Sequence, residues 1–214
     1  EITDEAFKAI LNFIRPGLTE REIAARLVYE LLRRGGEQVS FDPIVVSGPN
    51  GSLPHGVPSD KIIERGEFVT MDFGCVYHGY CSDMTRTYFC GEPSEKHAAI
   101  HDLVCRANAL AESMVRPGVA LKELDIAARS LIAEAGYGEY FTHRLGHGCG
   151  LDCHEPPDNS ASSPAVAEPG MVFSVEPGIY LPGKLGVRIE DLVLVTEDGC
   201  EVLNHASKEL RVVD

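Results

Sequence analysis

The chain has 214 residues, of which 44% are hydrophobic and 24% are charged, and its formal net charge is −14 at pH 7. A chain of this length can bury its own core, but so negative a surface repels the phosphates of nucleic acids and of anionic membranes. We therefore expect no nucleic-acid partner, and no apolar run is long enough to predict a membrane span. Seven cysteines cannot all pair with one another, which favours reduced thiols and a cytoplasmic protein.

A weak internal repeat indicates that one half of the chain duplicates the other. The triplet Arg-Pro-Gly follows the first expected helix of each half, and Asp-Phe-Gly in the first half is echoed by Glu-Pro-Gly in the second. Similar motifs in the same order suggest duplication. We predict a single domain, residues 1–214, with pseudo-duplicated halves of about 1–92 and 93–214. Because the chain starts at Glu1 rather than at a methionine, we also expect a natural N-terminal domain to be missing.

Hydrophobic periodicity and turn residues predict the same elements in both halves, two helices followed by two strands. Thr19 and Glu22 form a capping box that opens the second helix, and Gly35 marks its end. Two helices over a strand pair, used twice, predict an α+β fold with helices packed on a curved antiparallel sheet. The expected helices are about 3–14, 19–35, 94–115 and 121–135, and the expected strands are about 68–76, 82–89, 171–180 and 187–196.

Acidic residues interrupt the apolar strands of both halves. A buried carboxylate without a partner costs several kcal/mol or becomes protonated, so these acids need cations. Since alternate positions of a strand share a face, a hairpin in each half could aim Asp72 with Asp83, and Glu176 with Glu190, at a common centre. Together with the imidazole of His147, these donors suit two divalent ions, Mn²⁺ first, with Co²⁺ or Zn²⁺ as alternatives.

These motifs resemble the catalytic domain of the pita-bread metallopeptidases, a family that includes methionine aminopeptidases, Xaa-Pro aminopeptidases and Xaa-Pro dipeptidases. The resemblance runs from about Thr3 to Val195. It is carried by Val-Thr-Met-Asp-Phe-Gly, Cys-Ser-Asp-Met-Thr-Arg-Thr, His-Arg-Leu-Gly-His-Gly, Phe-Ser-Val-Glu-Pro-Gly and Gly-Val-Arg-Ile-Glu-Asp. It implies the pita-bread fold, a dinuclear metal site and a homodimeric full-length protein. The metal ligands that it implies are Asp72, Asp83, His147, Glu176 and Glu190.

The resemblance also implies roles for residues around the metals. Glu176 corresponds to the family's general base, and His154 is placed to stabilise the oxyanion of a tetrahedral intermediate. His55 and His143 match accessory histidines of the family, and we expect them to line the substrate pocket. Arg188 shares a strand face with the last ligand glutamate, so it could support a ligand carboxylate or hold an anion.

The expected substrate is a peptide or dipeptide with proline in the second position. The segment Leu-Pro-His-Gly-Val-Pro-Ser-Asp and the strand with Arg188 resemble the proline-directed branch, whereas methionine aminopeptidases typically have Gln at that strand position. The favoured interpretation is an Xaa-Pro aminopeptidase, which cleaves between an N-terminal residue and proline. The alternative is an Xaa-Pro dipeptidase. A methionine aminopeptidase and a non-catalytic pita-bread binding protein are less favoured.

The other histidines and the cysteines near the metal loop receive structural interpretations. Cys149 and Cys153 flank the metal histidine, but their compressed spacing disfavours a Cys₂His₂ zinc site, so we expect Cys149 to serve packing. Four further histidines are expected on the surface or in turns: His78, His97, His101 and His205.

Overall fold

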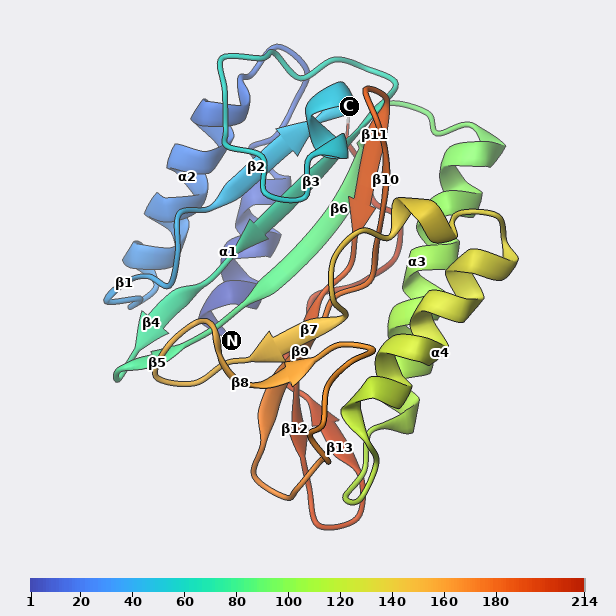
Figure 1. Cartoon of the computed structure of the whole chain (residues 1–214). Helices are drawn as coiled ribbons and strands as arrows, with labels where there is room; N and C mark the ends of the chain where they lie inside the picture. The colour runs from blue at the N-terminus through green and yellow to red at the C-terminus, as the bar shows by residue number, and fades with distance from the viewer. Residues whose placement is uncertain (214) are drawn as a thin grey trace.

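The computed structural model describes residues 1–213, in which four α-helices flank a layer of strands (Figure 1). Helices α1 and α2 lie along one side of the strands, and α3 and α4 lie along the other. The four expected helices are therefore present, in the expected order. Their bounds are α1 (Ile2–Leu11), α2 (Glu20–Arg33), α3 (Glu95–Met114) and α4 (Leu121–Glu134), with short 3₁₀ helices η1 (Gly48–Ser52) and η2 (Gly138–Tyr140).

Local signals fix the ends of α2 as expected. The Thr19 hydroxyl accepts a hydrogen bond from the Glu22 amide at 3.1 Å, and the Glu22 carboxylate accepts one from the Thr19 amide at 2.8 Å. Gly35 follows the helix with φ +103°, a left-handed conformation that glycine adopts readily. Helix α1 ends at Leu11, earlier than expected, because its last turn tightens and the Phe13 amide bonds the carbonyl three residues before it.

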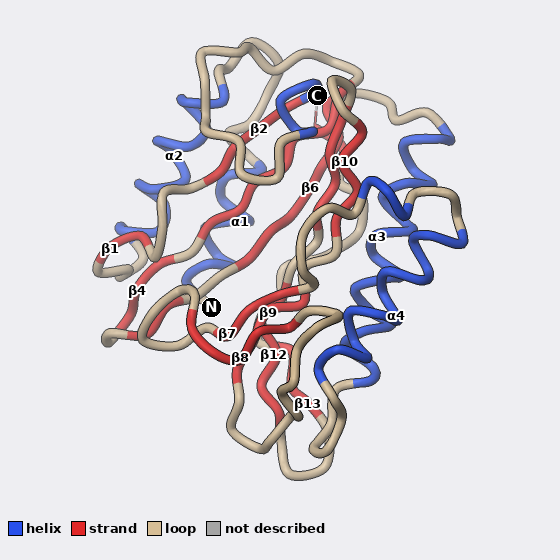
Figure 2. Tube along the Cα trace, viewed as in Figure 1, coloured by secondary structure: helices blue, strands red, loops and turns tan. Residues whose placement is uncertain are grey.

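The described strands pair in four groups, most of them antiparallel (Figure 2). The larger sheets have the orders β14-β6-β3-β2 and β13-β12-β9-β7-β8, and the smaller ones are β1-β4-β5 and β10-β11; the pair β14-β6 is parallel. The bounds are β1 (Gln38–Val39), β2 (Ile44–Ser47), β3 (Glu67–Phe73), β4 (Cys75–Tyr77), β5 (Tyr80–Cys81), β6 (Met84–Cys90), β7 (Gly146–Gly148), β8 (Glu155–Asn159), β9 (Val172–Val175), β10 (Gly178–Leu181), β11 (Leu185–Arg188), β12 (Asp191–Val195), β13 (Cys200–Val202) and β14 (Val212–Val213).

The long strands expected from the sequence are broken or shortened, and this expectation was wrong. Strand β3 ends just before Gly74, where a side chain would overlap the Ser82 carbonyl, so only glycine fits. Strands β9 and β10 are separated at Pro177, which has no amide hydrogen for a ladder. Three of the predicted ligands stand outside regular strands at such points: Asp83 before β6, Glu176 after β9 and Glu190 before β12.

The register of β3 and β6 corrects one geometric expectation. Asp72 is paired with Thr85, so Asp83 is not directly opposite it across the hairpin. The second half fits the expected arrangement better. Val175 pairs with Asp191, and Gly178 pairs with Arg188, so both registers place Glu176 across from Glu190 at the break.

Two apolar cores hold the helices on the strands. In the first, α1 and α2 pack on β3 and β6 through Val69, Met71 and Phe73, as the alternation of polar and apolar residues predicts. In the second, α3 and α4 pack on β9 to β12. Phe68 and Phe89 belong to this second core, with their ring centroids 5.0 Å apart, so β3 and β6 contact both cores. The duplicated halves and the single-domain boundary stay predictions.

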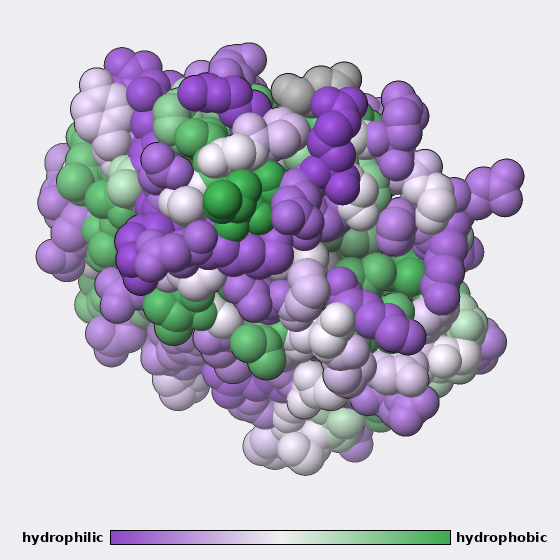
Figure 3. Space-filling view, turned by 90° about the horizontal axis from the view of Figure 1, so that it is seen from above, coloured by the Kyte–Doolittle hydropathy of each residue, from purple (hydrophilic) through white to green (hydrophobic). Residues whose placement is uncertain are grey.

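Polar side chains cover most of the face seen from above, with small apolar areas among them (Figure 3). Within residues 1–213, none of the helices combines the length and apolar character that a membrane span needs. One expectation about the surface was wrong. His101 is buried, and its Nε2 lies 3.2 Å from the Thr87 carbonyl oxygen, because it sits on the face of α3 that packs against β6.

Candidate metal centre

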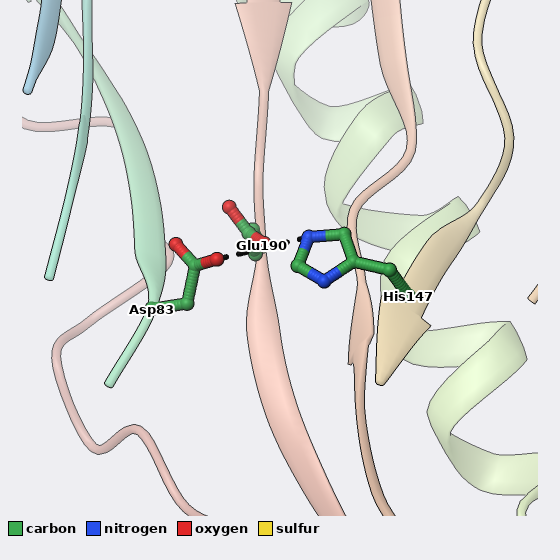
Figure 4. A group of neighbouring side chains, drawn as sticks. All are labelled: Asp83, His147 and Glu190. Carbon is green, nitrogen blue, oxygen red and sulfur yellow. Dashed lines mark ion pairs between the residues drawn. The ribbon is translucent and has the colours of Figure 1, made fainter. Parts of the chain in front are cut away.

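The five predicted ligands line one cavity of about 430 Å³. It lies where strands of the two halves meet, since Thr85 of β6 forms an antiparallel bridge with Glu190. The side chains of Asp83, His147 and Glu190 point toward one another from three different strand regions (Figure 4). Each offers a ligand atom, and these atoms lie within 4.8 Å of one another.

Distances among the side chains are short enough for shared ligation. His147 Nε2 lies 3.3 Å from Glu176 Oε1 and 3.7 Å from Asp83 Oδ2. The Thr85 hydroxyl donates to Glu190 Oε2 at 2.6 Å, which fixes that carboxylate. The strand breaks thus bring together groups that the sequence separates by more than a hundred residues.

Repulsion and burial make this cluster costly without cations. Burial, together with the charge of Glu190, raises the pKa of Asp83 well above its usual range, and burial with the charge of Glu176 does the same to Glu190. Burial also raises the pKa of Glu176 to about 7, against the opposing charge of Arg188. One buried oxygen of Asp72 and one of Asp83 have no hydrogen-bond partner among the described residues.

His147 is arranged as a neutral ligand. Burial lowers the pKa of its imidazole to about 4, so the ring is uncharged near neutral pH. Its Nδ1 lies 3.1 Å from the Gly148 carbonyl, which can only accept, so the proton belongs on Nδ1. Nε2 then presents its lone pair to the carboxylates, where a cation would receive it.

Arg188 contacts the predicted ligand Asp72 directly. Its guanidinium lies 2.7 Å from Asp72 Oδ2, and its Nε donates to the Thr85 hydroxyl at 3.0 Å. A second terminal nitrogen donates to the Pro54 carbonyl and to the Tyr180 hydroxyl, each at 2.9 Å. The arginine is therefore engaged in holding other groups, which fits the expected support of a ligand carboxylate better than the capture of an anion.

The predicted histidines surround the carboxylates. The His154 ring lies 3.9 Å from that of His147, centroid to centroid, and burial lowers the His154 pKa. His143 Nε2 bonds the Tyr180 hydroxyl at 2.8 Å, and burial lowers the pKa of His143 to about 3. His55 lines the same cavity from the loop after η1. The structure thus brings all the predicted ligands, the three predicted pocket histidines and Arg188 to one cavity.

Three polar residues of the site were not singled out by the sequence. Tyr180 joins His143 to Arg188; Ser174 donates to Glu176 Oε1 at 3.1 Å and accepts from the His147 amide at 3.0 Å. Arg144 lines the cavity wall. Positions two and four residues from Glu176 on the same strand face would have pointed to Ser174 and Tyr180.

The nearby cysteines are thiols, not metal ligands of a finger type. Cys149 is buried, in accord with a packing role. Cys153 donates to Asp83 Oδ2 at 3.4 Å. His147 points its Nε2 toward Asp83 and Glu176, not toward these sulfurs. The donor set at the centre is therefore oxygen-rich, and with its unpartnered carboxylate oxygens and neutral imidazole it fits divalent cations.

Comparison with known proteins agrees with this geometry. Residues 1–197 match the model of metallopeptidase family M24. The Xaa-Pro dipeptidase of Pyrococcus horikoshii is 48% identical over 210 residues, which make up 98% of this chain and 60% of that protein. The solved Xaa-Pro dipeptidase from Bacillus anthracis is 49% identical with a TM-score of 0.97, and the X-Pro aminopeptidase from Thermotoga maritima is 46% identical with a TM-score of 0.96; each comparison covers 99% of this chain and 60% of the other.

The chain belongs to metallopeptidase family M24. Its α+β architecture is the pita-bread fold of that family, within the branch that includes Xaa-Pro peptidases, and both predictions are confirmed. Family membership also implies divalent metal ions, which the Asp83, His147 and Glu190 group can accommodate. The chain spans about 60% of the length of the relatives that it matches.

Proposed function

We propose that the full-length protein is a metal-dependent exopeptidase that hydrolyses Xaa-Pro dipeptides. The observation that carries this proposal is the cavity at which four buried or half-buried carboxylates and a neutral imidazole converge with only partial hydrogen bonding. The sequence alone favoured the aminopeptidase, but the Xaa-Pro dipeptidases of Pyrococcus horikoshii and Bacillus anthracis support the dipeptidase alternative better.

The proposed metal ligands are Asp72, Asp83, His147, Glu176 and Glu190. We propose two divalent ions, with Mn²⁺ ahead of Co²⁺ and Zn²⁺, because the donors are mainly oxygen. When bound, such ions supply the Lewis acidity that activates water and polarises a carbonyl near neutral pH. The protein's contribution is the fixed geometry of the donors, held by Thr85, Ser174 and Arg188.

Glu176 is proposed as the proton acceptor for the attacking water. It is fixed by the Ser174 hydroxyl, and its raised pKa, about 7, shows how costly its charge is in this buried setting. His154 is proposed to stabilise the oxyanion that forms on the substrate carbonyl. His154 is close enough to His147 to share the reaction centre. The Tyr180 hydroxyl occupies the ring of His143 and not that of His154.

The cavity wall suggests how a dipeptide is recognised. His55 and His143 line it, and Arg144, which is 43% exposed in its side chain, pairs with Asp158 at 2.9 Å. We propose that Arg144 attracts the free carboxylate of the proline residue, because its pair with Asp158 is exposed and weak, whereas the pair of Arg188 with Asp72 is buried. A carboxylate in the third position of a longer peptide would lie elsewhere. A volume of about 430 Å³ is at the lower end for small-molecule sites and suits a short substrate.

Peptide cleavage by the full-length, metal-loaded protein tests the proposal. We expect Ala-Pro and Met-Pro to be cleaved faster than Ala-Ala, and dipeptides faster than Ala-Pro-Ala. Preferred cleavage of Ala-Pro-Ala would support the aminopeptidase. Preferred cleavage of Met-Ala-Ala would support a methionine aminopeptidase, and no cleavage of any of these peptides would support a binding protein.

The aminopeptidase stays the second candidate because the Thermotoga maritima X-Pro aminopeptidase has nearly the same fold as this chain. Two further proposals concern the whole protein. We propose a homodimer, on the basis of the family resemblance alone. We also propose a cytoplasmic location, because an odd number of cysteines, seven, cannot form a complete set of internal disulfides.

A further inference from the structure

A buried carboxylate outside the metal centre has an unusually complete set of hydrogen bonds. Glu20 opens helix α2 and is fully buried. Its Oε1 accepts from the Ser47 amide at 2.7 Å and from the Ser47 hydroxyl at 3.0 Å. Its Oε2 accepts from the Ser59 amide at 3.1 Å and from the Ser59 hydroxyl at 2.6 Å. The Asn50 side-chain amide lies 3.2 Å from both oxygens.

The groups that Glu20 holds are the two ends of one loop. Ser47 ends β2, Asn50 lies in η1, and Ser59 lies beyond the segment that carries His55. The first turn of α2 adds two backbone bonds to the far end of this loop, from the Glu20 amide to the Lys61 carbonyl and from the Arg21 amide to the Ser59 carbonyl. Helix α2 therefore clamps the loop at its base.

At the tip of the loop Gly56 is buried beside Val46, but the larger apolar side chains are exposed. Leu53 is 57% exposed and Val57 is 81% exposed, so neither anchors the tip in a core. The opposite support comes from β11 and the turn before it, where the Gly183 amide donates to the Ser52 hydroxyl and Arg188 donates to the Pro54 carbonyl. The loop is thus held by hydrogen bonds with Glu20 on one side and with the strand that carries Arg188 on the other.

We propose that Glu20 is a positioning residue that sets the place of His55 at the cavity. This inference rests on the proposed peptidase function, in which His55 contacts the substrate. A single carboxylate can satisfy donors from both ends of the loop at once, because it is an acceptor only and has two oxygens. In a Glu20→Gln variant, one of these oxygens becomes an amide that donates, and it would face the donors of Ser47 or Ser59.

The matched control is Glu22→Gln, in the same helical turn. The Glu22 carboxylate accepts its hydrogen bonds from Thr19 in the capping box, not from the loop, so its replacement perturbs α2 without releasing His55. In the full-length, Mn²⁺-loaded protein we expect Glu20→Gln to lower kcat/KM for Ala-Pro by about 10- to 100-fold, because a displacement of about 1 Å can have that effect. We expect less than about a threefold change for Glu22→Gln, and unchanged metal content in both.

A double-mutant cycle with His55→Ala separates positioning from general damage. If Glu20 acts through His55, Glu20→Gln has little further effect on kcat/KM in the His55→Ala background. Hydrogen exchange of the amides of residues 53–58, except Pro54 and Pro58, which have no amide hydrogen, is expected to be faster in Glu20→Gln than in Glu22→Gln. Equal kcat/KM values for the two single variants, or an undiminished Glu20→Gln effect without His55, would overturn the inference.

The same measurements keep this inference separate from the proposed function. If the wild-type protein cleaves no peptide, the proposed function fails, but the exchange comparison still tests the loop. Faster exchange of residues 53–58 in Glu20→Gln alone would then support the clamp, and equal exchange in both variants would overturn it.

Discussion

Glu190 and Asp191 are neighbours in sequence, and both are buried, but they lie in opposite charge environments. Asp191 is matched by cations: the Arg86 guanidinium lies 2.6 Å from it, and the Lys208 ammonium also lies at 2.6 Å. Lys208 in turn pairs with Glu112 at 2.7 Å. Two carboxylates and two cations are therefore in contact in this cluster, and burial with the charge of Asp191 raises the pKa of Glu112 to about 7.

Glu190, by contrast, joins Asp72, Asp83 and Glu176 around one cavity, and Arg188 contacts one of these carboxylates, that of Asp72. Burial of acids therefore does not by itself indicate a metal site. The cluster around Asp191 has as many cations as carboxylates, whereas the cavity has four carboxylates, one of them in contact with an arginine, and therefore requires cations from solution.

The largest effect is expected at the cavity. Asp83→Asn removes a charged ligand while preserving the side chain's shape. We expect full-length Asp83→Asn to lose metal and to have a lower kcat/KM for Ala-Pro. Loss of one oxyanion donor lowers the rate by about 10²–10³-fold, and the effect of Asp83→Asn should be larger. Elemental analysis and steady-state kinetics measure both. Asp102→Asn, in an exposed pair with Arg106, is the control. Retention of metal and rate in Asp83→Asn would exclude it as a ligand.

The second prediction concerns the cluster around Asp191. Asp191→Asn leaves the buried Arg86 without its partner, so we expect the free energy of unfolding to fall by about 3–5 kcal/mol. Denaturant unfolding of the metal-free protein measures it, with Asp102→Asn again as control, for which about 0–1 kcal/mol is expected. Asp83→Asn should by contrast raise the stability of the metal-free protein, because it relieves repulsion. A change of the same sign in the unfolding free energy of both variants would show that the two carboxylate clusters do not differ in charge balance.

The third prediction separates ligation from catalysis within the cavity. His154→Ala should keep the metals and lower kcat by about 10²–10³-fold if it is an oxyanion donor. His147→Ala should lose metal, because Nε2 faces the carboxylates. Metal content and kcat are measured together on the full-length variants. Equal metal loss in both would contradict the division of roles.

The fourth prediction is a pH dependence that reverses with metal. Glu176 ionises at about 7 in the folded, metal-free protein, against an ordinary value of 4.5. The unfolded chain loses this proton first, so the contribution to stability is present below pH 4.5 and is lost as the pH rises toward about 7. Each pKa unit corresponds to about 1.4 kcal/mol, so a change of a few kcal/mol is expected.

Unfolding free energies at about pH 5 and about pH 8, with chelator or with Mn²⁺, measure this dependence. With Mn²⁺ the trend should reverse, because cations bind the deprotonated ligands and stabilise them as the pH rises. The same pH trend with and without metal would mean that the carboxylates near Glu176 do not bind the ion.

Local rules were enough to predict much of the fold, because helix signals lie close together in sequence. The capping box at Thr19 and the glycine after α2 are where they were expected. The continuous strands were not found, because Gly74 meets the Ser82 backbone and the chain bends at Pro177, contacts that depend on the folded hairpins. The surface assignment of His101 failed for the same reason, since its partner strand lies elsewhere in the chain.

The residues of the candidate site were predictable, but their connections were not. Acids in apolar strands pointed to a shared centre, and the structure brings them to one cavity. The register that pairs Asp72 with Thr85, and the link from His143 through Tyr180 to Arg188, depend on how each half folds. The contacts of Thr85 with Glu190 and of Asp72 with Arg188 arise only when the two halves meet. A sequence shows which side chains need partners; the fold decides which partners they find.

Metal uptake by the metal-free full-length protein is the decisive test of whether the carboxylates of the cavity bind divalent ions. After chelation, Mn²⁺ is added and the bound ions are counted by elemental analysis, while thermal unfolding is followed in parallel. The imbalance of charge around Glu190 predicts two ions per chain and a higher Tm on binding, since a ligand that binds only the folded state stabilises it. Asp83→Asn should bind fewer ions, and Asp102→Asn should behave like the wild type. A metal-free wild-type protein that takes up no Mn²⁺, Co²⁺ or Zn²⁺ and keeps the same Tm would contradict the assignment of a metal site to this cavity.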